Sequence, residues 1–489
     1  MKSHTARCIF WAAIALGVIA DRLFYGQIIG INLLILLTIS LAVSELILWD
    51  STIPMRRESR FLIWSATLFA AAISWRDSPV LTTLNLAAIF VILMLVVQRR
   101  HNGAFLRSPV TEYLFAMVPV TLESVIGFIP LVRKEINWAE SSHERRNYYV
   151  LTLARGLLIA TPLVLVFGSL FYSADSQFSA LVRHLFDWDF ADILSNLLWT
   201  LFCAAVAAGC IRVLLIWDNN RMDQIKPDWA SLGKGELFIV IGLMNILFFT
   251  FVMIQFRFLF GSHDLVQLTP GLTYTQYARS GFFELVWVTL LVLPTLLILD
   301  WLFANYTRIQ LIVFRSLTCA LVIQLFVIML SALHRMQLYV VSFGLTELRL
   351  YVTVFMAWLA IVFVWFLVTV LRGRRDRFAF GAFFAALAVI LGLNVINPDS
   401  MIVRYNRSRL QNAAALDTSY LEGLSADAVP DLVQLAKSMA DTNKRQSLTT
   451  YLAATYVPNS HLDWRSWNWS RDQAIRSTSR ISTTNATEK

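Results

Sequence analysis

The sequence predicts an all-α fold, a polytopic bundle of about eleven transmembrane helices followed by a small helical extracytoplasmic tail. Three observations predict it. Hydrophobic residues make up 57% of the 489 residues and charged residues only 15%, with a mean hydropathy of +0.61. Apolar runs of membrane-spanning length recur along the chain. Lys and Arg gather in short clusters between alternate runs, as the positive-inside rule expects.

Most of the predicted spans are apolar runs of roughly 17 to 25 residues, long enough to cross about 30 Å of hydrocarbon. They are Cys8–Phe24, Ile28–Leu48, the shorter Phe61–Trp75, Val80–Val97, Val150–Phe171, Ile193–Ile216, Leu237–Leu259, Phe283–Leu302, Ile309–Leu330, Tyr351–Leu371 and Phe378–Ile396. A twelfth apolar stretch, Val110–Leu131, is interrupted by Pro119, Glu123 and Pro130, and we expect it to be interfacial or re-entrant. A crossing there would move every later loop to the other side.

The loop charges predict the orientation. Clusters such as Arg56, Arg57 and Arg60 fall in the loops of one side, whereas the opposite loops carry single cations such as Arg76 and Arg183. Positive residues are retained in the cytoplasm. The N-terminus is therefore expected in the cytoplasm and the C-terminus outside.

The chain is expected to divide into a membrane domain (residues 1–396), a helical tail (397–470) and a disordered C-terminus (471–489). Pro398 should end the last span. Beyond Arg471 the Ser, Thr and Arg composition predicts disorder.

Two short helices are expected in the tail. Asp427 is the predicted N-cap of the first, with Pro430 in its first turn and apolar residues on one face. The second covers Leu448–Tyr456 and would pack on the first as a hairpin. The indoles of the DWRSWNW segment, residues 463–469, suit the headgroup boundary.

Composition and motifs exclude several classes of function. The net charge of +9 does not indicate nucleic-acid binding, because the cations lie in membrane loops. All four cysteines fall in apolar runs; Cys203 and Cys210 could share a helix face, but no His or carboxylate stands at ligand spacing, so core packing is expected rather than a metal site. Catalytic signatures such as Walker A, HExxH or GxSxG do not occur. The sequence thus identifies no catalytic residue, metal or cofactor.

The most informative stretch is Leu272–Leu285, LTYTQYARSGFFEL, which runs from a polar, aromatic approach into an apolar segment. In a helix, Tyr277 and Glu284 would share one face. A carboxylate just inside an apolar span is costly and is usually paired or placed beside water. Tyr277, Arg279 and Glu284 are therefore candidate functional residues. The alternative is a structural ion pair between Glu284 and Arg257.

Two further polar segments lie on the same predicted side. YSADSQF, residues 172–178, contains Asp175, which could bind a cation or cap a short amphipathic helix. The segment Ser331–Leu350 joins the ninth and tenth spans and contains His334, Arg335 and Glu347. His334 could titrate near neutral pH, or it could be an ordinary hydrogen-bonded loop residue.

The segment Asn394–Arg409 leaves the last span and carries Asp399 and Arg404. It lies on the same predicted side of the membrane as the three segments above. A functional site in this chain should therefore face outward.

These motifs together carry a resemblance to a known family. SADSQF, TYTQYARSGFFEL, HRMQLYVVSFGLTELRLY, NPDSMIVRYNRSR, LDTSYLEGLSADAVPDL and DWRSWN resemble the bacterial membrane family catalogued as a domain of unknown function, the 4153/4173 group. The resemblance covers about Val150 to Trp469. It implies a multi-pass bacterial inner-membrane protein, and it transfers no catalytic residue.

The expected function is that of a non-enzymatic envelope sensor or regulatory protein, acting through its outer loops and tail. Its expected partners are the lipid bilayer and another envelope or signalling protein. One alternative is a small-solute transporter with Glu284 as the coupling carboxylate. A third class is an envelope transferase that uses Asp21 or Asp175.

Overall fold

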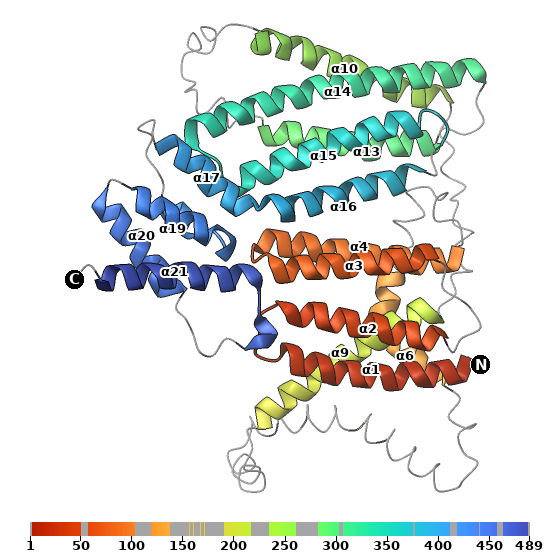
Figure 1. The fold of residues 1–489 in the computed structure, drawn as a ribbon. Coiled ribbons are helices and arrows are strands. Elements are labelled where there is room, and N and C mark those ends of the chain that lie inside the picture. The colour runs from red at the N-terminus through yellow and green to blue at the C-terminus, as the bar shows by residue number, and fades with distance from the viewer. Residues whose placement is uncertain are drawn as a thin grey trace.

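The structure, a computed structural model, describes residues 2–49, 57–102, 119–136, 190–216, 234–260, 282–302, 307–374, 377–410, 418–439, 441–456 and 463–487, with the isolated helical residues Gly156, Ala160, Phe167 and Phe171. Every regular element in these ranges is helical (Figure 1).

The long helices run side by side. They are α1 (Lys2–Phe24), α2 (Ile31–Trp49), α3 (Arg57–Trp75), α4 (Pro79–Asn102), α9 (Phe190–Leu215), α10 (Lys234–Phe260), α13 (Phe282–Leu302), α14 (Arg308–Phe343), α15 (Glu347–Thr369) and α16 (Phe378–Ile396). Between α4 and α9 lie the short α6 (Phe128–Pro130) and the π-helical turn η1 (Leu131–Glu135).

Seven helices within the described ranges are long and apolar enough to cross a membrane: α4, α9, α10, α13, α14, α15 and α16. α2 and α3 contain shorter apolar stretches, Ile31–Ile47 and Arg60–Trp75. These helices support a multi-pass membrane protein. Eleven spans are not established, because α1 is not among the seven and the predicted span Val150–Phe171 lies almost wholly outside the described residues.

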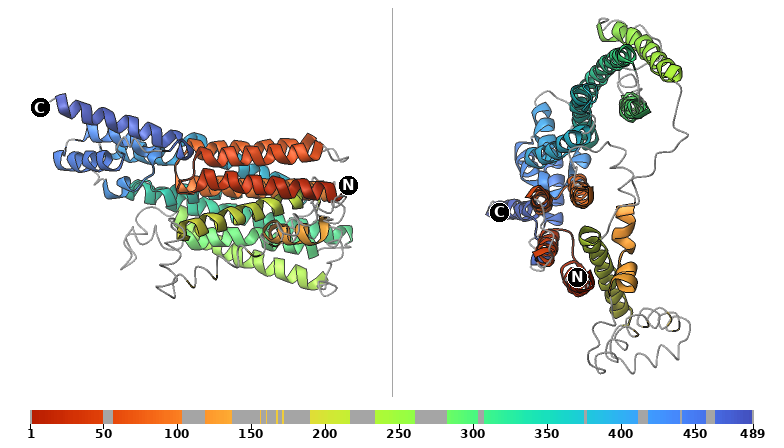
Figure 2. Two further views of the ribbon diagram at one scale, coloured as in Figure 1. Left: turned by 90° about the horizontal axis from the view of Figure 1, so that it is seen from below. Right: turned by 90° about the vertical axis from the view of Figure 1, so that its right-hand side faces the viewer.

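The described long helices form a curved row (Figure 2). Successive neighbours are α10, α14, α15, α16, α4, α3, α2, α1 and α9, while α13 packs on α14 and α15, and α9 also contacts α2 and α4. The contact between α16 and α4 therefore brings the later half of the row, α10 to α16, against the earlier half, α1 to α9. We call this contact the seam.

The tail lies beyond one end of the helix axes, next to the ends of α3, α15 and α16 (Figure 1). It comprises α17 (Pro398–Leu410), α18 (Thr418–Glu422), the 3-10 turn η4 (Ala426–Ala428), α19 (Val429–Ser438), α20 (Thr442–Thr455), the 3-10 turn η5 (Trp464–Ser466) and α21 (Trp469–Thr487). Leu432, Leu448 and Leu452 are buried in a tail core that also includes Leu81 of α4 and Leu393 of α16. The tail core is thus continuous with the bundle.

One asparagine and two prolines set helix boundaries in the tail. Asn397 adopts a left-handed conformation, φ +57°, and ends α16, as its polar side chain permits. Pro398 then begins α17, and Pro430 stands in the first turn of α19, where a missing N–H costs nothing. The buried face of α19 carries Val429, Leu432, Val433, Leu435 and Ala436.

The structure differs from the sequence prediction in three places. The predicted loop from Ser331 is helical as far as Phe343, because α14 is one helix of 36 residues. Helix α21 covers residues 469–487, most of the stretch for which composition predicts disorder. The predicted N-cap is wrong: Ser425 caps η4, and Asp427 turns toward the bundle.

Candidate functional site

The buried polar residues of the chain concentrate where the tail meets the bundle, and we call this contact the tail junction. Asp427 of η4 is 4% exposed. Its Oδ2 accepts the backbone N–H groups of Asp77 and Ser78, both at 2.8 Å. These N–H groups stand at the start of α4, where a helix leaves its donors unsatisfied and favours a negative charge. Asp427 therefore caps a bundle helix from the tail.

Arg76 joins three parts of the molecule. Its guanidinium lies 3.5 Å from Oδ1 of Asp427 in the tail. Its Nε donates to the carbonyl of Asn394 at 2.7 Å, and its Nη2 to that of Val395 at 3.4 Å, at the C-terminal end of α16. Burial lowers the pKa of Arg76, and the charge of Asp427 opposes this shift. One buried arginine thus connects α3, α16 and the tail above the seam.

The start of α21 closes the junction from the other side. Nδ2 of Asn468 donates to the carbonyls of Ile73 and Arg76 at the end of α3, at 2.9 and 3.0 Å. Arg471 pairs with Asp77 at 2.6 Å. Burial raises the pKa of Asp77, and Arg471 opposes this shift. The tail therefore supplies donors both to backbone carbonyls at the C-terminal end of α3, which lack partners within the helix, and to the carboxylate of Asp77 in the loop that follows.

Below the junction, the seam contains a buried pair of amides. Asn85 of α4 and Asn394 of α16 are 0% and 1% exposed, and each donates its Nδ2 to the other's Oδ1, at 3.0 and 2.9 Å. An amide pair of this kind fixes the register of two membrane helices because an unpaired amide is costly in hydrocarbon.

Asp399, in the first turn of α17, is a second buried carboxylate of the junction. It is 0% exposed. Its Oδ2 accepts the Ser425 hydroxyl and, at 3.4 Å, the Ser425 N–H, and its carboxyl group also interacts with that of Glu347. Burial raises the pKa of Asp399 to about 6; the Ser425 hydroxyl opposes the shift, and the charges of Glu347 and Asp427 add to it.

Two buried hydroxyls lie near this carboxylate. They belong to Ser78 and Tyr351, which lie close enough to interact with each other. The charges of Asp399, Glu347 and Asp427 all act on the Tyr351 hydroxyl. Three acidic groups thus share a region in which Arg76 supplies a counter-charge to Asp427 and Asp399. A neutral, protonated Asp399 would relieve their mutual repulsion.

The outer edge of the junction ties α17 and α18 to the turn between α14 and α15. The side-chain amide of Asn406 bonds both the N–H and the carbonyl of Leu345, at 2.9 and 2.8 Å. The hydroxyl of Tyr420 accepts the backbone N–H of Glu347 at 2.8 Å. These contacts hold Glu347 close to Asp399.

The structure brings together two of the residues predicted from sequence, Glu347 and Asp399, and places Arg404 at the edge of the same junction. Arg404 is largely exposed and lies 3.8 Å from Asp431. The other described candidates lie elsewhere: His334 is exposed and Arg335 buried on α14, and Glu284 is exposed in the first turn of α13.

The remaining candidates, Asp175, Tyr277 and Arg279, lie outside the described residues. The expected pairing of Glu284 with Arg257 also falls outside them, since the side chains from residue 255 to residue 281 are not described.

Sequence reasoning missed the two residues that organise the junction. The sequence predicts Arg76 to be one of the single cations of the outer loops and Asp427 to be the N-cap of its own helix. One local signal existed: Arg76–Asp77–Ser78 precedes Pro79, and a polar triplet before a proline marks a helix start that needs a cap. The capping group comes from a residue about 350 positions away, so periodicity could not have identified it.

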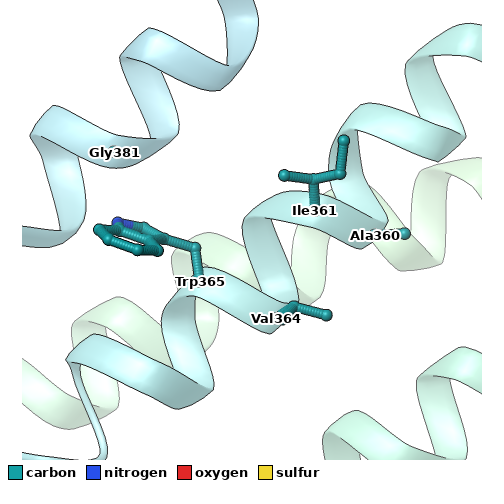
Figure 3. A pocket seen from close by; sticks show the side chains of 5 residues that line it. All are labelled: Ala360, Ile361, Val364, Trp365 and Gly381. Carbon is teal, nitrogen blue, oxygen red and sulfur yellow. The ribbon is translucent and has the colours of Figure 1, made fainter.

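One groove in the bundle has an almost entirely apolar lining. A groove of about 420 Å³ on α15 and α16 is lined by Ala360, Ile361, Val364, Trp365 and Gly381 (Figure 3). The indole Nε1 of Trp365 donates to the Arg377 carbonyl at 3.3 Å. Within the described ranges, no three His, Cys, Asp or Glu side chains gather so that they could hold a metal ion.

The fold and the junction define a class: a multi-span helical membrane protein whose C-terminal tail is bound to the bundle by buried charges. The family model described as Domain of unknown function (DUF4153) matches residues 63–435. The chain belongs to this family, as the resemblance of its motifs predicts. The matched region runs from α3 into α19 and so includes Arg76, Asp399 and Asp427. No curated protein and no solved structure matches the chain.

Proposed function

We propose that this protein is a non-enzymatic membrane sensor or regulatory protein in which docking of the tail responds to the proton concentration around it. One observation carries the proposal. Asp399 lies fully buried between the tail and the bundle, beside the carboxyl group of Glu347 and close to that of Asp427.

The direction of the response follows from linkage. The pKa of Asp399 is about 6 when the tail is docked, against an ordinary value of 3.8. A raised carboxyl pKa means that the docked form binds the proton more tightly, so docking is favoured at low pH and weakens as the pH rises through about 6. The difference corresponds to at most about 3 kcal/mol.

The response can reach the bundle because the junction lies over the seam. Arg76 holds the carbonyls of Asn394 and Val395 together with Asp427. Loosening the tail would remove the partner of a buried arginine that joins both halves of the row. The state of the tail is thereby linked to the contact between the halves, which is what a sensor needs to pass a signal to another envelope or signalling protein.

We place the protein in a bacterial inner membrane, as the family resemblance implies, with a cytoplasmic N-terminus and an extracytoplasmic tail, an orientation that the distribution of charge supports. Arg372, Arg374 and Arg377 are exposed between α15 and α16, at the end of the bundle opposite the tail. Clusters of exposed arginine at the ends of spans are retained in the cytoplasm.

The proposal is tested by measuring a distance across the junction. Spin labels are placed at Thr83→Cys on α4 and Gln473→Cys on α21, both exposed, after the four native cysteines are replaced by alanine. At about pH 5 we expect one narrow distance distribution; at about pH 8 a longer or broader population should grow. Asp399→Asn should keep the narrow distribution at both values.

A matched control is Asp441→Asn, which removes an exposed carboxylate from the start of α20. This variant should respond to pH as the wild type does. Identical distributions at both pH values in the wild type would contradict the proposal.

The transporter alternative gains no support from the described residues. Glu284 is exposed on α13, and neither of the two cavities described for the bundle contains it. One of these two cavities is polar and is lined by Asp21 rather than by Glu284.

A further inference from the structure

A polar cavity of about 540 Å³ opens at the tail end of the helix pair α1 and α9. Its volume falls in the range of sites for small ligands. It lies at the N-terminal end of the candidate span Ser195–Leu215 of α9, where lipid headgroups are expected. Its lining comes from α1, the turn after it, α9 and η5, with the residues Asp21, Arg22, Tyr25, Asn196, Leu197, Thr200 and Arg465.

Two hydrogen-bond acceptors in this lining have no partner. Oδ1 of Asp21 and Oδ1 of Asn196 are both buried, and neither is hydrogen-bonded within the described ranges. A buried acceptor without a donor costs roughly 1 to 3 kcal/mol. Such an arrangement is typical of a site that a ligand completes, and here the ligand must supply N–H or O–H donors.

The charges of the lining are divided. Asp21 supplies a carboxylate, whereas Arg22 and Arg465 supply guanidinium groups. Arg465 is positioned by Asp463, whose Oδ2 accepts its Nε at 2.7 Å, and by the carbonyl of Arg22. The Arg465 hydrogen bonds also lower the pKa of Asp463. A ligand that matches this lining carries a positive donor group and a negative group.

The wall contributed by the tail is fixed in place. Ser466 donates to the side-chain carbonyl of Gln27 at 2.7 Å, and the N–H of Ile31 donates to the Trp467 carbonyl at 3.0 Å. Gly30 admits this approach, because a Cβ there would lie 2.6 Å from the Trp467 carbonyl oxygen. The cavity is therefore formed before any ligand arrives, which lowers the entropic cost of binding.

We propose that this cavity binds a zwitterion with a primary ammonium and a phosphate or carboxylate group, such as a phosphoethanolamine headgroup. The ammonium donates to Asp21 and Asn196, and the anionic group lies against Arg22 and Arg465. A quaternary ammonium has no N–H donor, so it would leave both buried acceptors unsatisfied. The proposal is independent of the pH response of the tail.

Binding is measured on the full chain in phosphatidylcholine nanodiscs, with soluble O-phosphoethanolamine as the probe and phosphocholine as the comparison. We expect O-phosphoethanolamine to bind about tenfold or more tightly than phosphocholine, since a site built for donors rejects an analogue that lacks them. The ligand in the membrane is either a lipid headgroup or a free small molecule. To distinguish them, protein is taken from nanodiscs that contain both phosphatidylethanolamine and phosphatidylcholine, and native mass spectrometry shows which lipid stays bound.

Two variants test the assignment of the acceptors. Asp21→Asn keeps the shape but removes the charge, and it should weaken O-phosphoethanolamine binding about tenfold. Asn196→Leu removes the second acceptor and should weaken it several-fold. Glu284→Gln, an exposed carboxylate outside the cavity, is the control and should bind as the wild type does.

Elution volume and helical content confirm that each variant is folded. Retention of phosphatidylethanolamine alone, without binding of the soluble probe, would still support the site and identify a lipid as its source. The proposal is overturned if neither form binds, if phosphocholine binds equally well, or if folded Asp21→Asn binds like the wild type.

Discussion

Two carboxylates of the tail junction lie close together and behave differently. Asp427 accepts hydrogen bonds from Arg76, Asp77, Ser78 and Ser470. Asp399 accepts hydrogen bonds from Ser425 among the described residues, and its carboxyl group also interacts with that of Glu347. Both side chains are buried, but Asp427 anchors the tail to the bundle, whereas Asp399 is the group whose pKa is raised. The two carboxylates differ in the number of hydrogen-bond donors around them, not in their depth of burial.

The largest effect is expected from removing the anchor. Asp427→Ala leaves Arg76 buried without its carboxylate and uncaps the start of α4, and breaking a buried pair in this way costs about 3 to 5 kcal/mol. We expect a lower unfolding midpoint for the membrane protein and rapid proteolysis of the tail. Asp427→Asn retains a hydrogen-bond acceptor, so its unfolding midpoint should fall less than that of Asp427→Ala. Wild-type stability of Asp427→Ala would show that the two residues are not coupled.

The second effect concerns the protonatable side. Asp399→Asn removes the charge whose burial is unfavourable above about pH 6. The variant should therefore be more stable than the wild type at about pH 8, by at most about 3 kcal/mol, and nearly equal to it at about pH 4. Thermal unfolding at both values measures the difference. A loss of stability at high pH would mean that the Asp399 charge is favourable in the docked state.

A smaller effect is expected at the seam. Hydrogen bonds between membrane helices contribute on average about 0.6 kcal/mol, so Asn85→Ala and Asn394→Ala should each destabilise the bundle by about 1 kcal/mol. Their effects should be less than additive in the double variant, because both remove the same pair. Full additivity would contradict a direct interaction between the two amides.

The smallest effect is expected at sites that the sequence alone favours. Glu284→Gln and His334→Gln alter exposed side chains on α13 and α14. Each should change stability by less than about 0.5 kcal/mol and leave the pH response of the tail unchanged. If His334→Gln abolished the pH response, the pH-sensing group would be this histidine and not Asp399.

The sequence predicts the helical membrane class well because length and hydropathy are local properties. It also predicts Glu347 and Asp399 on the same side of the membrane, and the structure brings the two residues together. It cannot show that Asp427 caps α4, since that contact joins residues about 350 positions apart. Nor can it show that α14 continues to Phe343, because polar residues such as His334 and Arg335 are tolerated on a helix that extends beyond the membrane.

The most direct test is an infrared titration of the Asp399 carboxyl, as the difference between wild-type protein and Asp399→Asn. The account predicts a protonated carboxyl band that is present only in the wild type and disappears with a midpoint near pH 6. A midpoint near the ordinary value of 3.8 would contradict it, because Asp399 would then be charged throughout the physiological range and could not link tail docking to pH.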